Sequence, residues 1–220
     1  MIKQSTFNEG VQEFDRRERR TDFFALASNL ISKGFDIEAH ILLLATWNFA
    51  RFRYAVKEFD IEKFRKTLRN LDKNFNALKN QTLGSIDLNK HQSDITTIFE
   101  ALSAIKGIEF TGAPKLMHLV NPRLFVMWDN YIRGAKSKQF YSDLPIINSG
   151  EWIFENYPSN AEGYIRFLKD MQCRFRHLSP PSSSKTLAKA IDEFNYVHIT
   201  LAIQEMEKRR KNLSNHGSEA

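Results

Sequence analysis

The sequence predicts an all-α protein, and two observations support this. Apolar residues recur at intervals of three and four through most of the chain, which is the spacing of one helix face. No two segments show the alternating pattern of paired strands. With 220 residues, of which 42% are hydrophobic and 26% charged, the chain has an ordinary globular composition and can bury a core.

The helical spacing is clearest in two segments. Within 61–71 the apolar residues stand 3, 4 and 3 positions apart, and 92–106 repeats this spacing before Gly107 stops it. The other expected helices are an N-terminal helix or helix pair that ends at Gly34, a buried helix over 37–56, and helices at 113–120, 160–175 and 185–211.

Three segments do not have the spacing of a helix. Residues 123–128 are apolar enough to favour one isolated strand, after which Asp129 opens a short helix. The run of Ser and Pro at 179–184 predicts a linker, and the polar residues 212–220 predict a disordered tail.

Charge and cysteine content narrow the function classes. The chain has 32 Lys and Arg against 26 Asp and Glu, a formal charge of +6, which suits a polyanionic partner without proving one. The single cysteine, Cys173, excludes a disulfide framework and favours a reducing compartment. The histidines lack metal-ligand spacing, so we expect no metal site. Neither a membrane span nor a secretory leader is expected.

Residues 105–133 are the most informative stretch. They predict a helix, a tight turn at Gly107, a second short helix, an apolar crossing, and then Asp129. A turn between two helices directs backbone N–H groups outward at a helix N-terminus, where they can bind a phosphate. An aspartate at the end of the crossing can lie partly buried beside that turn.

This stretch resembles the helix-hairpin-helix (HhH-GPD) superfamily of DNA glycosylases, which includes endonuclease III and 8-oxoguanine glycosylase. Gly107 matches the first hairpin glycine, Ala113 the small residue of the second helix, Asp129 the catalytic aspartate and Arg133 the arginine after it. Gly107 and Asp129 lie 22 residues apart, as in the endonuclease III branch. The stretch is also similar to a less characterised bacterial set with this fold, through Lys115, Leu116, His118, Asn121, Pro122, Phe125 and Asp129.

The resemblance implies a two-lobed helical fold with a cleft between the lobes. The central lobe would span 35–134 and contain the hairpin at 98–120. The second lobe would combine 1–34 with 135–211. It also implies an enzyme that binds double-stranded DNA as a monomer, without a cofactor, in the cytoplasm at the nucleoid.

The implied activity is excision of a damaged or modified base. The base is flipped into a pocket, and the Asp129 carboxylate stabilises the oxocarbenium-like transition state and directs a water. A helix N-cap is the alternative role for Asp129. DNA contacts are expected at Gly107, Ile108, Glu109, Gly112, Lys115, His118 and Arg133. For Lys115 and His118 the alternative is a solvated helix face.

Two departures from the family pattern bear on the chemistry. Glu109 replaces the second hairpin glycine and brings a negative charge to the turn. Thr111 stands where bifunctional members carry a lysine nucleophile, and threonine cannot form an imine. We therefore expect a monofunctional enzyme that leaves an abasic site, although an amine from Lys115 is a possible substitute. No cluster of cysteines follows, which excludes the iron–sulfur loop of some members.

A second cluster combines aromatic residues with arginine. Trp47, Asn48 and Arg51 could line a base pocket, since aromatic rings stack on bases and arginine binds phosphate. Core aromatics beside an arginine that reaches solvent are the alternative. Three other functions stay open for the whole chain: a non-catalytic DNA-binding protein, an unrelated helical interaction protein, and a glycosylase that acts on modified phage DNA in defence.

Overall fold

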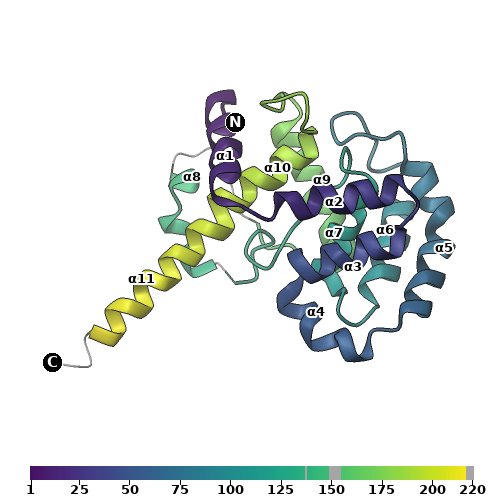
Figure 1. The fold of residues 1–220 in the computed structure, drawn as a ribbon. Coiled ribbons are helices and arrows are strands. Elements are labelled where there is room, and N and C mark those ends of the chain that lie inside the picture. Colours follow the sequence, from purple (N-terminus) through teal and green to yellow (C-terminus); the bar gives the residue numbers. More distant parts are fainter. Residues whose placement is uncertain (137, 149–154, 217–220) are drawn as a thin grey trace.

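A computed structural model describes residues 1–136, 138–148 and 155–216 (Figure 1). These residues form helices joined by loops and contain no strand, which confirms the all-α prediction. In chain order the elements are α1 (Gln4–Arg17), α2 (Thr21–Ser32), α3 (Asp36–Trp47), α4 (Phe49–Ala55), η1 (Val56–Glu58), α5 (Ile61–Leu78), α6 (Gln92–Ser103), α7 (Glu109–Val120), η2 (Lys138–Asp143), α8 (Pro145–Asn148), α9 (Ala161–Phe175), α10 (Leu187–Asn195), η3 (Tyr196–Leu201) and α11 (Ala202–His216).

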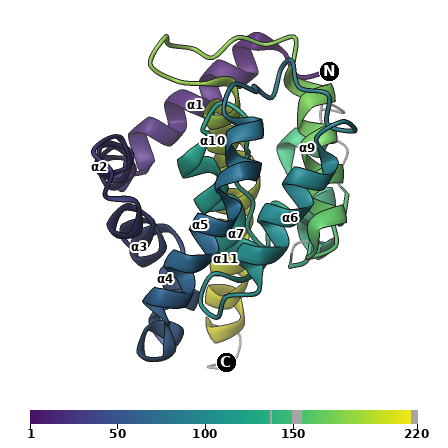
Figure 2. The ribbon, with the colours of Figure 1, turned by 90° about the vertical axis from the view of Figure 1, so that its right-hand side faces the viewer.

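Helix α7 lies at the centre of one group of helices. It packs against α2, α3 and α6, and α5 covers α6 from outside (Figure 2). All residues from Thr111 to Leu119 are buried, so this helix has no solvated face. Its small residues, Gly112 and Ala113, let neighbouring helices approach closely.

A second group is built around the C-terminal helices. Helix α1 packs on α10 and η3, and α9 joins this group to α6. Figure 1 shows α11 extending away from the rest of the molecule as a protruding rod. Helix α2, which we assigned to the second lobe, contacts α3 and α7 of the first group.

The two segments with the most regular spacing form helices as predicted. Asp60 caps α5 by accepting a hydrogen bond from the Lys63 N–H at 2.9 Å, and Phe64 and Leu71 are buried beneath it. In α6 the residues at the same spacing, Ile95, Ile98 and Leu102, are fully buried. In both helices the apolar spacing in the sequence therefore identified residues that are buried in the structure.

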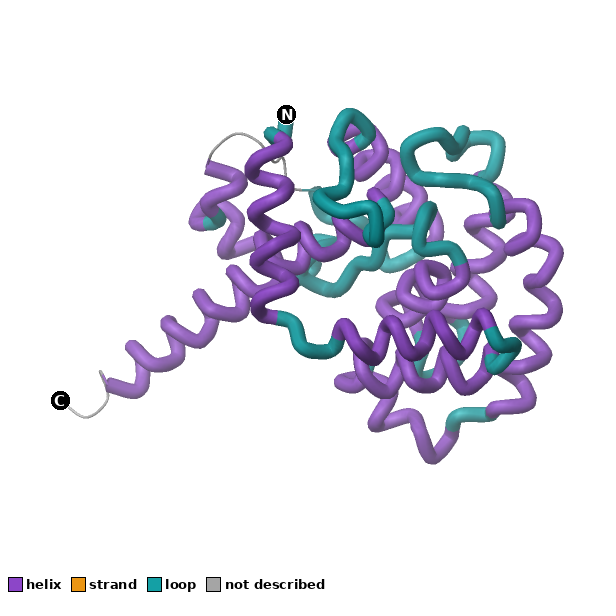
Figure 3. The backbone as a smooth tube through the Cα atoms, turned by 45° about the horizontal axis from the view of Figure 1, so that its top comes forward, coloured by secondary structure: helices purple, strands orange, loops and turns teal. Residues whose placement is uncertain are grey.

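Several boundaries differ from the expected ones. Residues 123–128 form no strand, and residues 130–133 are turns and form no helix. Figure 3 accordingly draws only helices and loops in the described part of the chain. Residues 124–128 are all buried and all apolar, and such a continuous apolar run in the sequence is typical of a buried strand. Residues 212–216, expected in a disordered tail, continue α11, whereas 217–220 lie outside the described residues.

The predicted C-terminal helix is divided in two by a wider turn. Between α10 and α11, η3 is π-helical, so it holds an extra residue without interrupting the rod. Two of its residues, Tyr196 and Thr200, reach the site described next.

Candidate functional site

The turn between α6 and α7 has the backbone conformation that its sequence requires. Gly107 has φ +91°, and a Cβ on this residue would lie 2.8 Å from the Cβ of Ala55. Glu109 also has a positive φ, +51°, which is unusual for a residue with a side chain. The position at which the resemblance expects a second glycine thus adopts the conformation that favours glycine.

Asn48 supports this turn from α3 and α4. Its Nδ2 donates to the Gly107 carbonyl at 2.9 Å, and its Oδ1 accepts from the Thr111 hydroxyl at 3.3 Å. The side chain is buried, so these bonds are protected from water. Asn48 therefore fixes the hairpin as well as lining the cavity beside it.

A proline inside α7 helps to position the crossing. Pro114 has no N–H, so the carbonyl of Phe110, four residues earlier, loses its usual helical partner. That carbonyl instead accepts a hydrogen bond from the indole Nε1 of Trp128 at 2.7 Å. Because Asp129 follows Trp128 directly, this bond ties the aspartate to the second helix of the hairpin.

Both carboxylate oxygens of Asp129 accept hydrogen bonds. Oδ1 accepts from the backbone N–H groups of Tyr131 and Ile132, each at 2.8 Å, and Oδ2 accepts from the Thr200 hydroxyl at 2.8 Å. Asp129 caps a turn here, since no helix follows it. These three donors fix the direction of the carboxylate.

Asp129 lines a cavity of about 390 Å³ beside the hairpin. The walls come from the α3–α4 junction, α7, the crossing, and the segment formed by α10 and η3. Five residues singled out from the sequence meet on this surface: Trp47, Asn48, Arg51, Lys115 and Asp129. The structure thus brings the expected carboxylate and the expected pocket residues to one cavity.

Lys115 extends into this cavity from α7. Its side chain is only 8% exposed, and its Nζ donates to the Thr111 carbonyl at 2.9 Å. Burial lowers the pKa of its ammonium group from 10.5 to about 8, while Asp129 and Asp192 act in the opposite direction. Lys115 therefore does not lie on a solvated helix face but lines the cavity, and its contact with DNA stays a prediction.

His118 also lies in the interior and not on a solvated helix face. It is fully buried, and its Nδ1–H donates to the Phe125 carbonyl at 2.5 Å. Burial lowers the pKa of the imidazole to about 3, so the ring is neutral. Its role is to bind the crossing to α7.

The other expected DNA contacts differ in their accessibility. The N–H groups of Ile108 and Glu109 donate to the Ile105 carbonyl at 3.1 and 3.2 Å, and that of Gly112 donates to Ile108 at 2.8 Å. These three amides are therefore engaged within the protein. The N–H groups of Gly107, at the turn, and of Phe110 and Thr111, in the first turn of α7, have no backbone acceptor among the described residues, since a helix supplies none at its N-terminus.

The two expected arginines flank Phe110. Arg51 forms an ion pair with Glu109 and lies 4.9 Å from the Phe110 ring centroid. Arg133 lies 4.8 Å from the same ring and donates to the Tyr157 carbonyl at 2.9 Å. Both side chains are partly exposed at the edge of the hairpin.

Sequence reasoning missed the contribution of α10 and η3. Asp192, Tyr196 and Thr200 face the cavity from these elements. Burial raises the pKa of the Asp192 carboxyl to about 6, although Lys189 opposes the shift. Polar residues at 192, 196 and 200 recur every four positions along one helix face, which was the available signal.

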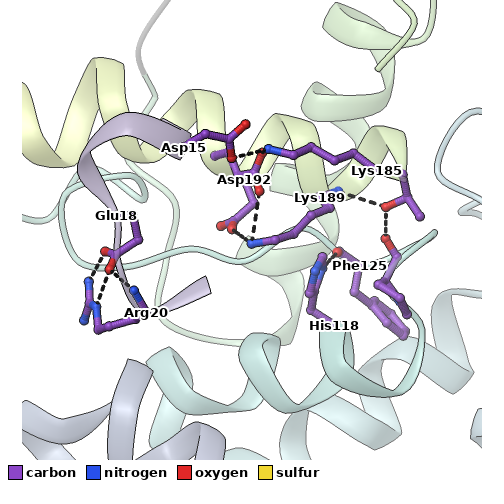
Figure 4. Close-up of polar contacts among 11 residues, drawn as sticks. Asp15, Glu18, Arg20, His118, Phe125, Lys185, Lys189 and Asp192 are labelled. Atoms are coloured by element: carbon purple, nitrogen blue, oxygen red, sulfur yellow. Dashed lines mark hydrogen bonds and ion pairs between the residues drawn. The ribbon is translucent and has the colours of Figure 1, made fainter. Parts of the chain in front are cut away.

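Behind this wall lies a network of charged side chains (Figure 4). Lys189 contacts Asp192 at 3.3 Å and Glu193 at 3.7 Å, and Lys185 contacts Glu193 and Asp15, each at 2.6 Å. The network joins α10 to α1 and fixes the wall that carries Asp192.

A second cavity of about 390 Å³ lies between α2, α3 and α5. It is lined by His40, Asp36 and Asp72 among others, and of the residues singled out from the sequence it contains Asn121 and none of the expected catalytic, DNA-binding or base-pocket residues. Within the described residues, no group of three His, Cys, Asp or Glu is arranged to hold a metal ion. None of the described helices is long and apolar enough to cross a membrane.

Comparison with protein-family models, with curated proteins and with solved structures gave no match to this chain. The functional interpretation therefore depends on the residues and geometry described above.

Proposed function

We propose that this protein is a DNA N-glycosylase with Asp129 as its catalytic carboxylate. The observation that supports this most is the placement of Asp129 on a cavity beside the hairpin turn, at the sequence separation that the resemblance expects. A carboxyl on an outer surface, remote from the turn, would have removed the basis for the proposal.

The geometry suits the chemistry of base excision. The cavity of about 390 Å³ is of a size that accepts one extruded base. As the bond between C1′ and the base breaks, positive charge develops on the sugar, and a fixed carboxylate stabilises it and orients a water for attack. The three hydrogen bonds to Asp129 hold the carboxylate in place without reorganisation.

In this proposal double-stranded DNA lies across the hairpin, in a cleft between two helical lobes. The amides of Phe110 and Thr111 would bind a backbone phosphate. Thr111, whose hydroxyl donates to Asn48, supplies no amine, which is consistent with a monofunctional enzyme. The protein would act as a monomer without a cofactor, at the nucleoid, in repair or in defence against modified phage DNA.

The test is an Asp129→Asn variant assayed on a panel of duplexes that each carry one modified base. Abasic sites are detected as strand breaks after alkali. We expect wild type to release at least one base, and the variant to release it at least about 100-fold more slowly, because the amide keeps the shape but not the charge. Asp143→Asn, at an exposed site, is the matched control and should retain full activity.

Two outcomes would contradict the proposal. If Asp129→Asn retains full base release, the carboxylate is not catalytic. If wild type binds duplexes with a steep salt dependence but releases no base from any of them, the chain is a non-catalytic DNA-binding protein. The departure from the family pattern at Glu109, in the hairpin, is the observation that favours this second function.

A further inference from the structure

The proposed role of Asp129 leaves one group in the cavity unexplained. Lys115 is a buried ammonium group that faces the same space, and an isolated buried charge is costly. An ammonium group has three N–H donors. Among the described residues only the Thr111 carbonyl accepts from it, so two donors remain for something that enters the cavity.

Four of the charged side chains that line the cavity with Lys115 are already engaged with other groups. Arg20 pairs with Glu18 and Arg51 pairs with Glu109. Asp129 accepts its three hydrogen bonds, and Asp192 pairs with Lys189. Lys115, in contrast, forms no ion pair with the described residues, and two of its three N–H donors are not used by them.

The charge of the departing base decides what such an ammonium group can do. An electroneutral base leaves with the electron pair of the broken bond and becomes an anion. A base already made cationic by alkylation leaves as a neutral molecule. A buried ammonium group stabilises the first kind of departure and disfavours binding of the second.

Building on the proposed function, we infer that the cavity takes an electroneutral base with a ring carbonyl, and that the Lys115 ammonium group donates to that base as it leaves. Lys115 is then a catalytic residue that contacts the substrate. Arg20 and Arg51, which also line the cavity, add to its preference against a cation.

The atoms and charges of this step balance. The bond between C1′ and the base nitrogen breaks, and its electron pair goes to the base, which takes a proton from the Lys115 ammonium group. A water oxygen bonds to C1′, and the proton that it loses goes to the Asp129 carboxylate. The products are a free base and an abasic sugar, and solvent returns the proton from Asp129 to Lys115.

The experiment compares three modified bases in one duplex sequence. Hypoxanthine is neutral and has a ring carbonyl, 1,N6-ethenoadenine is neutral without one, and 7-methylguanine is cationic. Uracil and 8-oxoguanine extend the first class. Single-turnover release is measured at pH 7 for wild type, Lys115→Met, and Lys73→Met, an exposed site on α5 that serves as control.

We expect wild type to release one or more of the neutral carbonyl bases at least about 10-fold faster than the other two classes. Lys115→Met should slow that release by about 100-fold or more, the usual effect of removing one positioned donor or acid, and Lys73→Met should not change it. Wild-type release should fall above pH 8, where the Lys115 ammonium loses its proton, and the variant should lack this fall.

Faster release of 7-methylguanine or ethenoadenine by wild type would overturn the inference, as would full activity of Lys115→Met. Borohydride trapping of a covalent complex through Lys115 would also overturn it, because the amine would then be a nucleophile. In each of these cases bases are still released and the proposed function stands. Absence of release from every duplex, in contrast, would refute the proposed function itself.

Discussion

Two buried lysines, on α7 and on α10, occupy opposite kinds of environment. Lys189 contacts two carboxylates, Asp192 and Glu193, and its Nζ lies within 5.3 Å of the ring centroids of Phe14, Phe24 and Trp47. Lys115 is also largely covered by the protein, but it forms no ion pair with the described residues and donates to one backbone carbonyl.

This contrast shows that the number of partners of a buried lysine indicates its role better than its degree of burial does. A buried cation with matched carboxylates and aromatic rings stabilises the place where two helices meet. One that lacks them lowers the stability of the fold and is retained where it can act on a ligand. We therefore expect Lys189 on α10 to stabilise the fold, whereas the catalytic role that we propose belongs to Lys115 on the α7 face of the cavity.

The largest expected effect is at the structural lysine. Lys189→Met leaves Asp192 buried without the cation that contacts it, and we expect the free energy of unfolding to fall by about 3–5 kcal/mol. Urea denaturation at pH 7 measures this, with Lys73→Met as the exposed control. A loss below about 1 kcal/mol would mean that Lys185 and solvent replace Lys189, and the contrast would fail.

The chemical lysine should behave in the opposite way. At pH 7 Lys115→Met should raise the free energy of unfolding by roughly 3 kcal/mol. Burial lowers the pKa of Lys115 from its ordinary value of 10.5 to about 8, and each pKa unit is worth about 1.4 kcal/mol. The same urea titration measures this change. The gain would accompany the loss of base release predicted above.

The pH dependence of the free energy of unfolding serves as the control for the Lys115→Met prediction. Between about pH 8 and 10.5 the unfolded chain binds the Lys115 proton more strongly than the folded chain, so wild type gains stability as the pH rises through this window. The advantage of Lys115→Met should shrink across the same window. A constant difference between pH 7 and pH 10 would show that packing, and not charge, causes it.

The smallest expected effect is at Glu109. Glu109→Gly relieves the positive φ, a gain of about 1 kcal/mol, and removes a partly exposed ion pair with Arg51 that contributes about 1 kcal/mol or less. We expect little net change in stability but tighter duplex binding, since a negative charge leaves the hairpin.

Glu109→Gln separates the effect of the lost negative charge from the effect of the relieved backbone strain. It removes the charge and keeps the backbone strain, so it should tighten DNA binding as Glu109→Gly does and should lack the compensating gain in stability. Equal or weaker duplex binding by both variants, measured by fluorescence anisotropy at several salt concentrations, would argue against DNA contact at this turn.

Regular helices were the easiest part of the fold to predict. In α5 and α6 one face is buried and the other is solvated, so apolar spacing reports directly on structure. The crossing over 124–128 is buried on every side, and such a run has no periodicity to distinguish an isolated extended segment from a strand.

The candidate site was predictable only in part. The separation between Gly107 and Asp129 identified the turn and the carboxylate, and Trp47, Asn48 and Arg51 do line the cavity. The surroundings of Lys115 and His118 could not be derived, because α7 is enclosed by three other helices and no local pattern states which neighbours will cover a charged side chain. Thr200, 71 residues from Asp129 in the chain, was invisible for the same reason.

The π-helical turn at Tyr196–Leu201 determines the direction in which the side chains of the following helix, α11, point around the helix axis. A residue more or less in an α-helix turns the following side chains by about 100°, so an insertion of this kind acts as an angular offset between α10 and α11. Helix α10 and the π-helical turn both pack on α1, while Asp192 and Thr200 face the cavity that holds Asp129. One continuous rod can thereby serve two partners that lie in different directions.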